Sequence, residues 1–329
     1  MENPLLSIVI PVYGVEKYIE QCVRSLFGQT YPNIEYIFVD DCTPDCSIDI
    51  IKKVLEDYPH RKCQIKFIRH VKNEGLARTR EDGIKAASGK YIASCDSDDW
   101  VEDEMYAQMV KKAQEEDTQV VICNMMSDSN SMKQIYKGWD ILSSDKVSDL
   151  LLGHIVPFIH SCVFHRDFIS NNHLLFAKAD MAEDLVLSVS MAYFSKNKIS
   201  YLEKPYYHYR INEDSISKKK NISSFLKRAN GIKENTDLII SFLCQHGLEK
   251  KYEQEILLRK HIVKNSIWPV VGNKMAYHLW RNLYPKIHCE ILRNRNYSFR
   301  TKLLYILTIL GIYPLYVRIK CKNKMKYFH

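Results

Sequence analysis

The chain has 329 residues, of which 46% are hydrophobic and 26% charged, a composition typical of a soluble globular protein with one large or two smaller domains. Its ten cysteines follow no zinc or disulfide spacing, so we interpret them as thiols in a reducing, cytoplasmic compartment. The sequence shows no signal peptide and no apolar run of about 18 residues, the length that spans a bilayer. The net charge of +8 comes without the aromatic–basic pattern of a nucleic-acid-binding module, so no nucleic acid is predicted as a partner.

The first 124 residues alternate between segments with strand character and segments with helical periodicity. Strands are expected at 6–13, 35–40, 64–69, 90–95 and 119–123, and helices at 15–26, 47–58, 76–87 and near 105–113. This alternation predicts an α/β fold, with a largely parallel sheet between two layers of helices and ligands beyond the carboxyl ends of the strands. The glycine fingerprint of dinucleotide folds and the Walker phosphate loop are absent, so a nucleotide would be bound through carboxylates and a metal.

The fourth expected strand ends at three carboxylates, those of Asp96, Asp98 and Asp99. In an extended segment Asp96 and Asp98 point to the same side, and like charges this close repel unless a cation lies between them. Mn²⁺ or Mg²⁺ would be that cation, because both take oxygen ligands, and Mg²⁺ adds substrate phosphates. The alternative is a solvated acidic turn in which Asp99 caps the following helix. Tyr13 and Asp41 are expected at other strand ends, which favours a binding site.

Several short motifs follow one another in order over roughly residues 5–215. They are Ser7-Ile-Val-Ile-Pro-Val-Tyr13, Gln29-Thr-Tyr-Pro-Asn33, Val39-Asp-Asp41, Asn73-Glu-Gly-Leu76, Arg80, Gly83-Ile84, Gly89-Lys-Tyr-Ile92 and Asp96-Ser-Asp-Asp99. Together they resemble the family 2 glycosyltransferases. The resemblance implies a GT-A fold, which is a nucleotide-diphospho-sugar transferase fold, and an inverting, metal-dependent transfer of a sugar from a nucleotide-sugar donor.

The resemblance also implies roles for single residues on the donor side. Tyr13 would pack on the base and Asp41 would hydrogen-bond to it, which favours uracil and therefore a UDP-sugar. Asp96 and Asp98 would hold the ribose and the metal on the diphosphate, and Arg80 would lie near the phosphates. The expected nucleotide-sugar-binding residues are Pro11, Tyr13, Asp41, Arg80, Asp96, Ser97, Tyr209 and Arg210, and the last two would touch the diphosphate.

Glu183-Asp184 resembles the family's Glu-Asp motif, which implies that Asp184 is the catalytic base. An inverting transfer needs one carboxylate to take the proton of the acceptor hydroxyl. The alternative is an acidic pair that stabilises the N-terminus of a helix. Cys42 and Cys46 depart from the family, because they stand at usual glycine positions, and Glu81 replaces a usual asparagine after Arg80.

We expect a GT-A domain over 1–215 and a helical C-terminal region over 216–329. Within the domain, 1–124 would be the nucleotide-binding half and 125–215 the acceptor half. The C-terminal region predicts helices near 222–245, 249–268, 275–293 and 299–320. No acidic residue follows Glu290, whereas nine basic residues do. An apolar block at 303–315 separates the basic residues at 293–302 from those at 318–326. This tail is either a core helix with a solvated basic end or an anchor on an anionic membrane surface.

These features favour a glycosyltransferase that moves a sugar from a UDP-sugar to a hydroxyl of a glycan or lipid-linked acceptor in cell-surface polysaccharide biosynthesis. The Gln-x-x-Arg-Trp signature of processive synthases is absent, so we expect one sugar per encounter. The enzyme would be cytoplasmic, with a peripheral position at the inner face of the cell membrane. One alternative is a sugar nucleotidyltransferase, which would carry a glycine-rich N-terminal loop with a basic residue. The other is a non-catalytic nucleotide-sugar-binding protein, which predicts loss of Asp96, Asp98 or Asp184.

Overall fold

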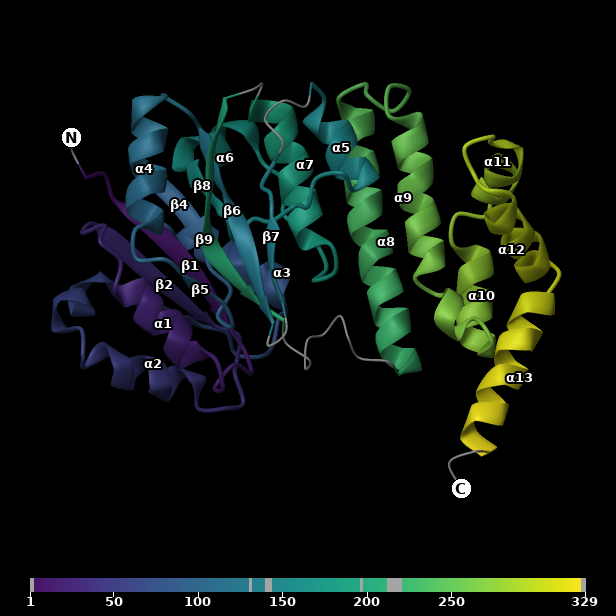
Figure 1. Ribbon diagram of the computed structural model, residues 1–329, viewed down its shortest axis with the longest axis horizontal. Helices are drawn as coiled ribbons and strands as arrows, with labels where there is room; N and C mark the ends of the chain where they lie inside the picture. The colour runs from purple at the N-terminus through teal and green to yellow at the C-terminus, as the bar shows by residue number, and fades with distance from the viewer. Residues whose placement is uncertain (1–2, 130–131, 140–143, 196–197, 212–220, 327–329) are drawn as a thin grey trace. The chain divides into compact units, whose positions relative to one another are not determined.

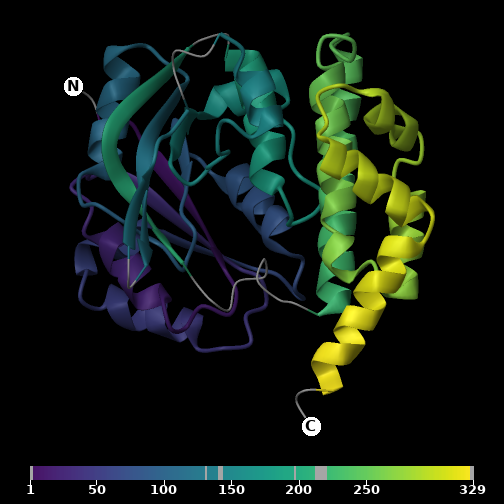
Figure 2. The same cartoon turned by 45° about the vertical axis from the view of Figure 1, so that its right-hand side comes forward.

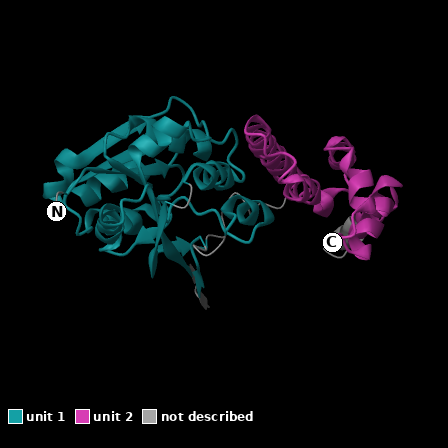
Figure 3. Ribbon diagram, turned by 90° about the horizontal axis from the view of Figure 1, so that it is seen from above, with its two compact units in different colours: residues 1–212 teal, residues 213–329 magenta. Residues whose placement is uncertain are grey.

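The computed structural model describes residues 3–129, 132–139, 144–195, 198–211 and 221–326. The chain divides into two compact units, 1–212 and 213–329, each of which is described by itself (Figure 3). The domain boundary expected at 215/216 lies within 212–220, outside the described residues.

Unit 1 is built on one mixed sheet. Its strands are β1 (Leu6–Val12), β2 (Ile34–Asp40), β3 (Ile65–Arg69), β4 (Tyr91–Ser94), β5 (Trp100–Val101), β6 (Val120–Ser129), β7 (Met132–Tyr136), β8 (Cys162–His165) and β9 (Ile199–Arg210). They lie in the order β3-β2-β1-β4-β8-β6-β9-β5, with β7 paired to β6. The four strands from β3 to β4 are parallel, as expected. Beyond them the sheet is mixed, because β8 lies antiparallel between β4 and β6, a pairing that needs no crossover helix.

Helices cover both faces of this sheet, which confirms the expected α/β class (Figures 1 and 2). They are α1 (Ile19–Phe27), α2 (Ser47–Leu55), α3 (Leu76–Ala86), α4 (Met105–Glu115), α5 (Lys146–Leu152), α6 (Arg166–Asn172) and α7 (Glu183–Ser195). Side chains alternate along β1, so Ile8 and Ile10 pack in a core with Ile19 of α1, whereas Val9 faces Gly83 of α3 on the other side. The first helix begins later than expected, because 15–18 form a turn that the Tyr18 N–H closes on Val15.

Unit 2 is helical, with α8 (Ile222–Gln245), α9 (Glu253–Asn265), α10 (Lys274–Asn282), α11 (Ile287–Arg293), α12 (Phe299–Ile309) and α13 (Ile312–Lys326). Its core gathers around Trp280 and Tyr305. Two helices expected as continuous are each broken. The 275–293 segment breaks at 283–286, where Pro285 cannot continue a helix, and the 299–320 segment breaks at Gly311, whose φ of +76° suits glycine.

The break at Gly311 turns α12 and α13 through 88°. In the part of the chain that the structure describes, no single helix has the length and apolar composition to cross a membrane. Only the bent pair of α12 with 312–320 of α13 meets both criteria, and it does so by length and composition alone.

Candidate active site

Three neighbouring parallel strands deliver acidic and aromatic side chains to one edge of the sheet. Val12 of β1 pairs with Asp40 of β2, so Tyr13 and Asp41 follow at the same level. β4 pairs with the other side of β1 and leads into Asp96. The carboxyl ends of the strands therefore meet where the sequence predicts them to meet.

Arg80 of α3 is the centre of the most densely charged part of this edge. The side chain is only 3% exposed. Its Nη2 donates to Asp96 Oδ1 at 2.7 Å, and its Nη1 donates to Glu183 Oε1 at 2.9 Å and reaches Asp184 Oδ1 at 3.5 Å. Its Nε donates to Ser94 Oγ at 3.3 Å. One guanidinium thus joins Asp96, in the loop after β4, to the acidic pair that begins α7.

Burial and repulsion set the protonation of these carboxylates. Burial raises the pKa of Asp184 well above its ordinary value, and the Glu183 carboxylate adds to the rise more than Arg80 opposes it. Burial also raises the pKa of Glu183. Burial opposes the ionisation of Asp96 as well, but the Arg80 guanidinium holds the pKa of that carboxyl below its ordinary value. Asp184 is therefore the more basic carboxylate and Asp96 the one that stays ionised.

Asp99 is a buried structural carboxylate and does not cap the following helix. Tyr207 donates its hydroxyl to Asp99 Oδ2 at 2.7 Å, and the Arg210 main-chain N–H donates to Oδ1 at 2.7 Å. The Tyr207 hydroxyl also accepts the Asp96 main-chain N–H at 3.1 Å. α4 begins after Glu104 without a side-chain cap, so the alternative of a solvated capping turn is wrong for Asp99.

Tyr209 and Arg210 point to opposite faces of β9, as neighbours in a strand must. Tyr209 stacks near His160, with 6.4 Å between ring centroids and 14° between planes. The Arg210 guanidinium lies 4.7 Å from the Trp100 ring and 5.2 Å from the Tyr18 ring. Its Nε donates to the Asp98 carbonyl at 2.9 Å and an Nη donates to Gln21. The two side chains therefore lie on opposite faces of β9, and both lie near the 96–99 loop.

Asp41 is buried and its carboxylate already has partners. The main-chain N–H groups of Glu74 and Gly75 donate to Oδ1 at 2.7 Å and to Oδ2 at 2.9 Å, and His70 Nδ1 lies 2.8 Å from Oδ1. Tyr13, by contrast, is 48% exposed, as a ring that receives a base from solvent would be. Cys42 has a φ of +57°, so it keeps the left-handed backbone that suits the usual glycine.

Pro11, Ser97 and Asp98 complete the residues that the sequence assigns to this edge. Pro11 is buried within β1, and Ser97, in the loop after β4, is only 5% exposed. Asp98 is partly exposed between Ser97 and Asp99. Of these three residues, Asp98 is the most exposed and so the one that a ligand in solution reaches most readily.

His160 and Tyr207 were not predicted as site residues. Burial lowers the pKa of His160 to about 4, so its ring is neutral at physiological pH. Its Nδ1 lies 3.6 Å from Asp96 Oδ2, and its ring centroid lies 4.5 Å from that of Tyr207. No local pattern in the sequence marks His160. Tyr207 lies two residues before Tyr209, an expected site residue, so the two-residue repeat of a strand is the signal that could have found it.

The acidic edge fits a divalent cation only together with a substrate. Among the described residues no three His, Cys, Asp or Glu side chains converge as a complete metal site. Asp98 offers a partly exposed carboxylate, while Asp96 is bound to Arg80. Mg²⁺ is commonly held by one or two carboxylates and completed by water and substrate phosphates. The oxygen donors present therefore suit Mg²⁺ or Mn²⁺ bound with a diphosphate.

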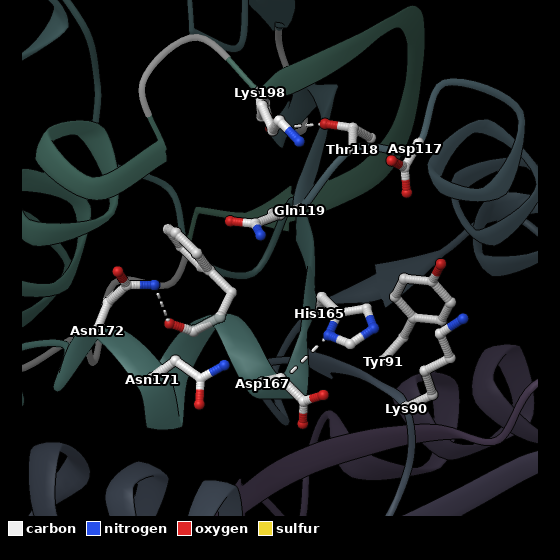
Figure 4. Close-up of a pocket in the computed structure, with 11 residues that line it drawn as sticks. Lys90, Tyr91, Asp117, Thr118, Gln119, His165, Asp167, Asn171, Asn172 and Lys198 are labelled. Atoms are coloured by element: carbon white, nitrogen blue, oxygen red, sulfur yellow. Dashed lines mark hydrogen bonds between the residues drawn. The ribbon is translucent and has the colours of Figure 1, made fainter.

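A separate cavity of about 500 Å³ lies at the opposite edge of the sheet (Figure 4). It is lined by residues at the beginnings of strands, among them Lys90 and Tyr91 at the start of β4, and by Asn171 and Asn172 of α6. Because Asp96 follows the other end of β4, this cavity does not belong to the Arg80 cluster.

Comparisons with known proteins concern the family and the fold of the chain. The sequence profile of Glycosyl transferase family 2 matches residues 7–174. The putative glycosyltransferase EpsH of Bacillus subtilis is 31% identical over 298 residues, which are 86% of this chain and 83% of EpsH. Residues 1–349 of S. aureus TarS in complex with UDP-GlcNAc superpose with a TM-score of 0.57 at 16% identity, over 97% of this chain and 92% of that one. The mannosyltransferase PcManGT from Pyrobaculum calidifontis, in complex with GDP-Man and Mn²⁺, gives 0.52 at 14% identity, over 95% and 88%. At these identities the two structures establish the GT-A fold.

Proposed function

The chain belongs to glycosyl transferase family 2, and from this premise we propose that it is a non-processive, inverting enzyme. It would move a sugar from a UDP-sugar to a hydroxyl of a glycan or lipid-linked acceptor. The reaction would belong to cell-surface polysaccharide biosynthesis. Family membership makes the chain a glycosyltransferase, and so decides against a sugar nucleotidyltransferase and against a protein that only binds nucleotide sugars. The donor, the acceptor and the stereochemistry are the proposed part.

The observation that carries the proposal is the Arg80 cluster. Inverting transfer needs a site for the donor diphosphate and, on the other side of the reacting carbon, a base for the acceptor hydroxyl. Arg80 contacts Asp96 on the proposed donor side and Glu183 and Asp184 on the proposed base side, over 2.7 to 3.5 Å. This brings together two motifs that lie far apart in the sequence, as a single catalytic centre requires.

Asp184 is the proposed base. A sugar hydroxyl is a weak nucleophile until its proton leaves, and Asp184 would accept that proton as the hydroxyl attacks the anomeric carbon. Burial raises the pKa of Asp184, which makes its carboxylate a stronger base than an exposed aspartate. Asp184 is the second residue of α7, within the 125–215 segment to which we assign the acceptor.

On the donor side we assign the base to Tyr13 and Asp41 and the ribose and diphosphate to Asp96, Asp98 and Arg80. Pro11, Ser97, Tyr209 and Arg210 complete the proposed donor set. Asp98, with Asp96, would hold Mn²⁺ or Mg²⁺. When bound, the cation would neutralise charge on the leaving diphosphate. The TarS complex with UDP-GlcNAc and the PcManGT complex with GDP-Man and Mn²⁺ support a nucleotide-sugar donor and a divalent cation by analogy of fold.

The test is acceptor-dependent transfer by Asp184→Asn. A panel of UDP-, GDP- and dTDP-sugars with Mn²⁺, with and without EDTA, first identifies the donor by slow nucleotide release. Asparagine keeps the size of aspartate but cannot take the proton, so transfer should fall by about 10²–10⁴-fold. UDP affinity should stay at the level of the parent protein. Normal turnover by Asp184→Asn would contradict the assignment of Asp184 as the base. Nucleotide release at the same rate with and without EDTA would contradict the proposed metal dependence.

We also propose that unit 2 places the enzyme at the cytoplasmic face of the membrane. Exposed apolar side chains recur at helical spacing along α12, at Phe299, Leu303, Ile306 and Leu310, and along α13, at Ile312, Leu315, Tyr316 and Ile319. They lie in a segment whose charged residues are all basic. An apolar helix face with basic neighbours suits the interface of an anionic bilayer, where each basic residue near the surface contributes about 1 kcal/mol.

The membrane proposal is tested by sedimentation with vesicles of phosphatidylglycerol and phosphatidylcholine. The parent should sediment, salt should release part of it, and the double variant Leu315→Glu/Ile319→Glu should stay in solution. Val71→Glu is the matched control, because Val71 is an exposed apolar residue of unit 1, with 94% of its surface accessible. Equal sedimentation of the parent and the double variant would exclude this surface as the anchor.

A further inference from the structure

The segment that leads into α7 contacts α3 at two successive levels. Asp180 Oδ1 accepts the Ala77 main-chain N–H at 3.2 Å. Three residues further along α3, the Arg80 guanidinium contacts Glu183 and Asp184 at 2.9 and 3.5 Å. The segment therefore runs along the first turns of α3, and the carboxylate of Asp180 is one of its points of attachment.

The first turn of α3 lacks a cap from its own neighbourhood. The residue at the N-cap position is Gly75, which has no side chain to accept the free N–H groups of the turn. Asp180, which is 103 residues away from Ala77, supplies an acceptor instead. A carboxylate at this position also gains from the positive end of the helix dipole.

Gly75 makes this contact possible. A Cβ atom at this position would lie 2.6 Å from Asp180 Oδ1 and 2.9 Å from Oδ2, closer than such atoms approach. Gly75 also has a φ of +91°, which side chains other than glycine rarely adopt. The Asp180 carboxylate therefore lies directly against the Gly75 backbone. This close approach leaves no room for the carboxylate to move nearer or for a longer side chain at position 180.

The segment is bent between its two attachments. Ala182 has a φ of +63°, a left-handed backbone that costs a non-glycine residue energy and persists where surrounding contacts hold it. It lies between Asp180 and the pair formed by Glu183 and Asp184. Release of Asp180 would therefore let the bend relax and would move Asp184.

We infer that Asp180 is a positioning residue that holds the segment carrying Asp184 against the first turn of α3. The inference rests on the proposed role of Asp184 as the base. The two residues that lead into this turn, Glu74 and Gly75, donate their main-chain N–H groups to Asp41, the residue that we assign to the nucleobase. Asp41 and Asp180 therefore hold adjacent parts of the segment at which α3 begins.

The test compares three substitutions of Asp180 by steady-state kinetics and by amide hydrogen exchange over residues 178–186. Asp180→Ala should lower kcat by about 10- to 10²-fold, since a misplacement of about 1 Å costs up to that much. KM for the donor and UDP affinity should change less than about twofold, because Asp41 accepts the Glu74 and Gly75 N–H groups directly, whereas the bond that is lost is the one from Ala77 to Asp180. Exchange over 178–186 should become faster.

The other two substitutions separate geometry from charge. Asp180→Asn keeps an oxygen that accepts the Ala77 N–H and should restore most of kcat and of the exchange protection. Asp180→Glu keeps the charge but is longer, and the Gly75 backbone leaves it no room, so it should behave like Asp180→Ala. Rescue by Glu and not by Asn would overturn the inference, since charge alone would then matter.

Asn273→Ala controls for general loss of stability. Asn273 caps α10 in unit 2 by accepting the N–H groups of Met275 and Ala276. It should lower the unfolding temperature while leaving kcat unchanged. If Asp180→Ala leaves the exchange rates unchanged, or lowers kcat only together with UDP affinity, Asp180 does not position the base. A parent protein that transfers no sugar would instead count against the proposed function, and exchange would still decide whether Asp180 holds the segment.

Discussion

Arg80 in unit 1 and Lys264 in unit 2 are both buried cations, and their surroundings are opposite. Arg80 contacts three carboxylates, those of Asp96, Glu183 and Asp184. Lys264 donates to the main-chain carbonyls of Trp280 and Leu283 and lies 4.3 Å from the Trp280 ring. In the described part of the chain no carboxylate forms an ion pair with it.

The pKa values follow this difference. Burial alone would lower the pKa of Arg80, but its three carboxylates outweigh burial and raise it. Burial lowers the pKa of Lys264 to about 7, since nothing negative compensates. Arg80 therefore stays charged beside an excess of carboxylates. Such a cluster of buried groups with shifted pKa values is typical of a functional site. Lys264 is about half protonated at pH 7 and donates hydrogen bonds to main-chain carbonyls at the end of α10.

The largest effect is expected for Arg80→Met. Removal of one partner from a buried charge cluster leaves the others uncompensated, so the free energy of unfolding at pH 7 should fall by about 3–5 kcal/mol. The loss should shrink towards pH 4, because protonation of Asp96, Glu183 and Asp184 removes their repulsion. Urea unfolding at both values of pH measures it. A loss that did not depend on pH would show that Arg80 acts through packing and not through charge.

The sequence predicts the site residues that follow from a local pattern, but not the contacts between residues far apart in the chain. Asp96 and Asp41 follow apolar strands, so the two-residue repeat and the α/β rule place them at one edge of the sheet. Asp184 was assigned through a motif. The contact between Arg80 and Glu183 joins residues 103 apart, and no local period predicts such a pair.

The remaining differences between sequence and structure have the same origin. The burial of His160 depends on Tyr207 and Tyr209 from a distant strand, so its own neighbours in the sequence give no signal. β8 is short and its antiparallel place between β4 and β6 is a tertiary choice. Helical periodicity continued through Gly311 because the apolar residues on both sides keep the spacing, although the backbone turns there.

An intermediate effect is expected for Lys264. Between the folded-state pKa near 7 and the ordinary value of 10.5, the unfolded chain binds more protons at Lys264 than the folded chain does. The contribution of Lys264 to stability should therefore rise with pH from about 7 to 9, by up to about 1.4 kcal/mol per pH unit. Lys264→Met should abolish that rise.

Hydrogen exchange of amides in α9 and α10 measures how the stability of unit 2 changes with pH, without a contribution from unit 1. Near pH 6 the variant should be close to the parent, because loss of the buried charge offsets loss of two hydrogen bonds to carbonyls. At pH 9 the parent should be more stable than the variant. If Lys264→Met kept the slope of the parent, another group would titrate and the contrast with Arg80 would lose its basis.

The smallest change in stability is expected for Glu183→Gln, which removes one negative charge from the Arg80 cluster. Glutamine keeps an oxygen that accepts from Arg80 Nη1, so the free energy of unfolding should change by about 1 kcal/mol or less. Transfer should fall by much less than the factor of about 10²–10⁴ that is typical of losing a general base.

The informative readout for Glu183→Gln is the pH dependence of kcat/KM. The base must be unprotonated, so activity falls as pH drops through the pKa of Asp184. Burial and then the Glu183 carboxylate raise that pKa in the parent. Without the negative charge of Glu183 the pKa of Asp184 should fall, and the acid limb of the profile should move to lower pH. An unmoved acid limb would mean that the limb belongs to another group, and a shift to higher pH would mean that Glu183 supports the ionisation of Asp184 instead of opposing it.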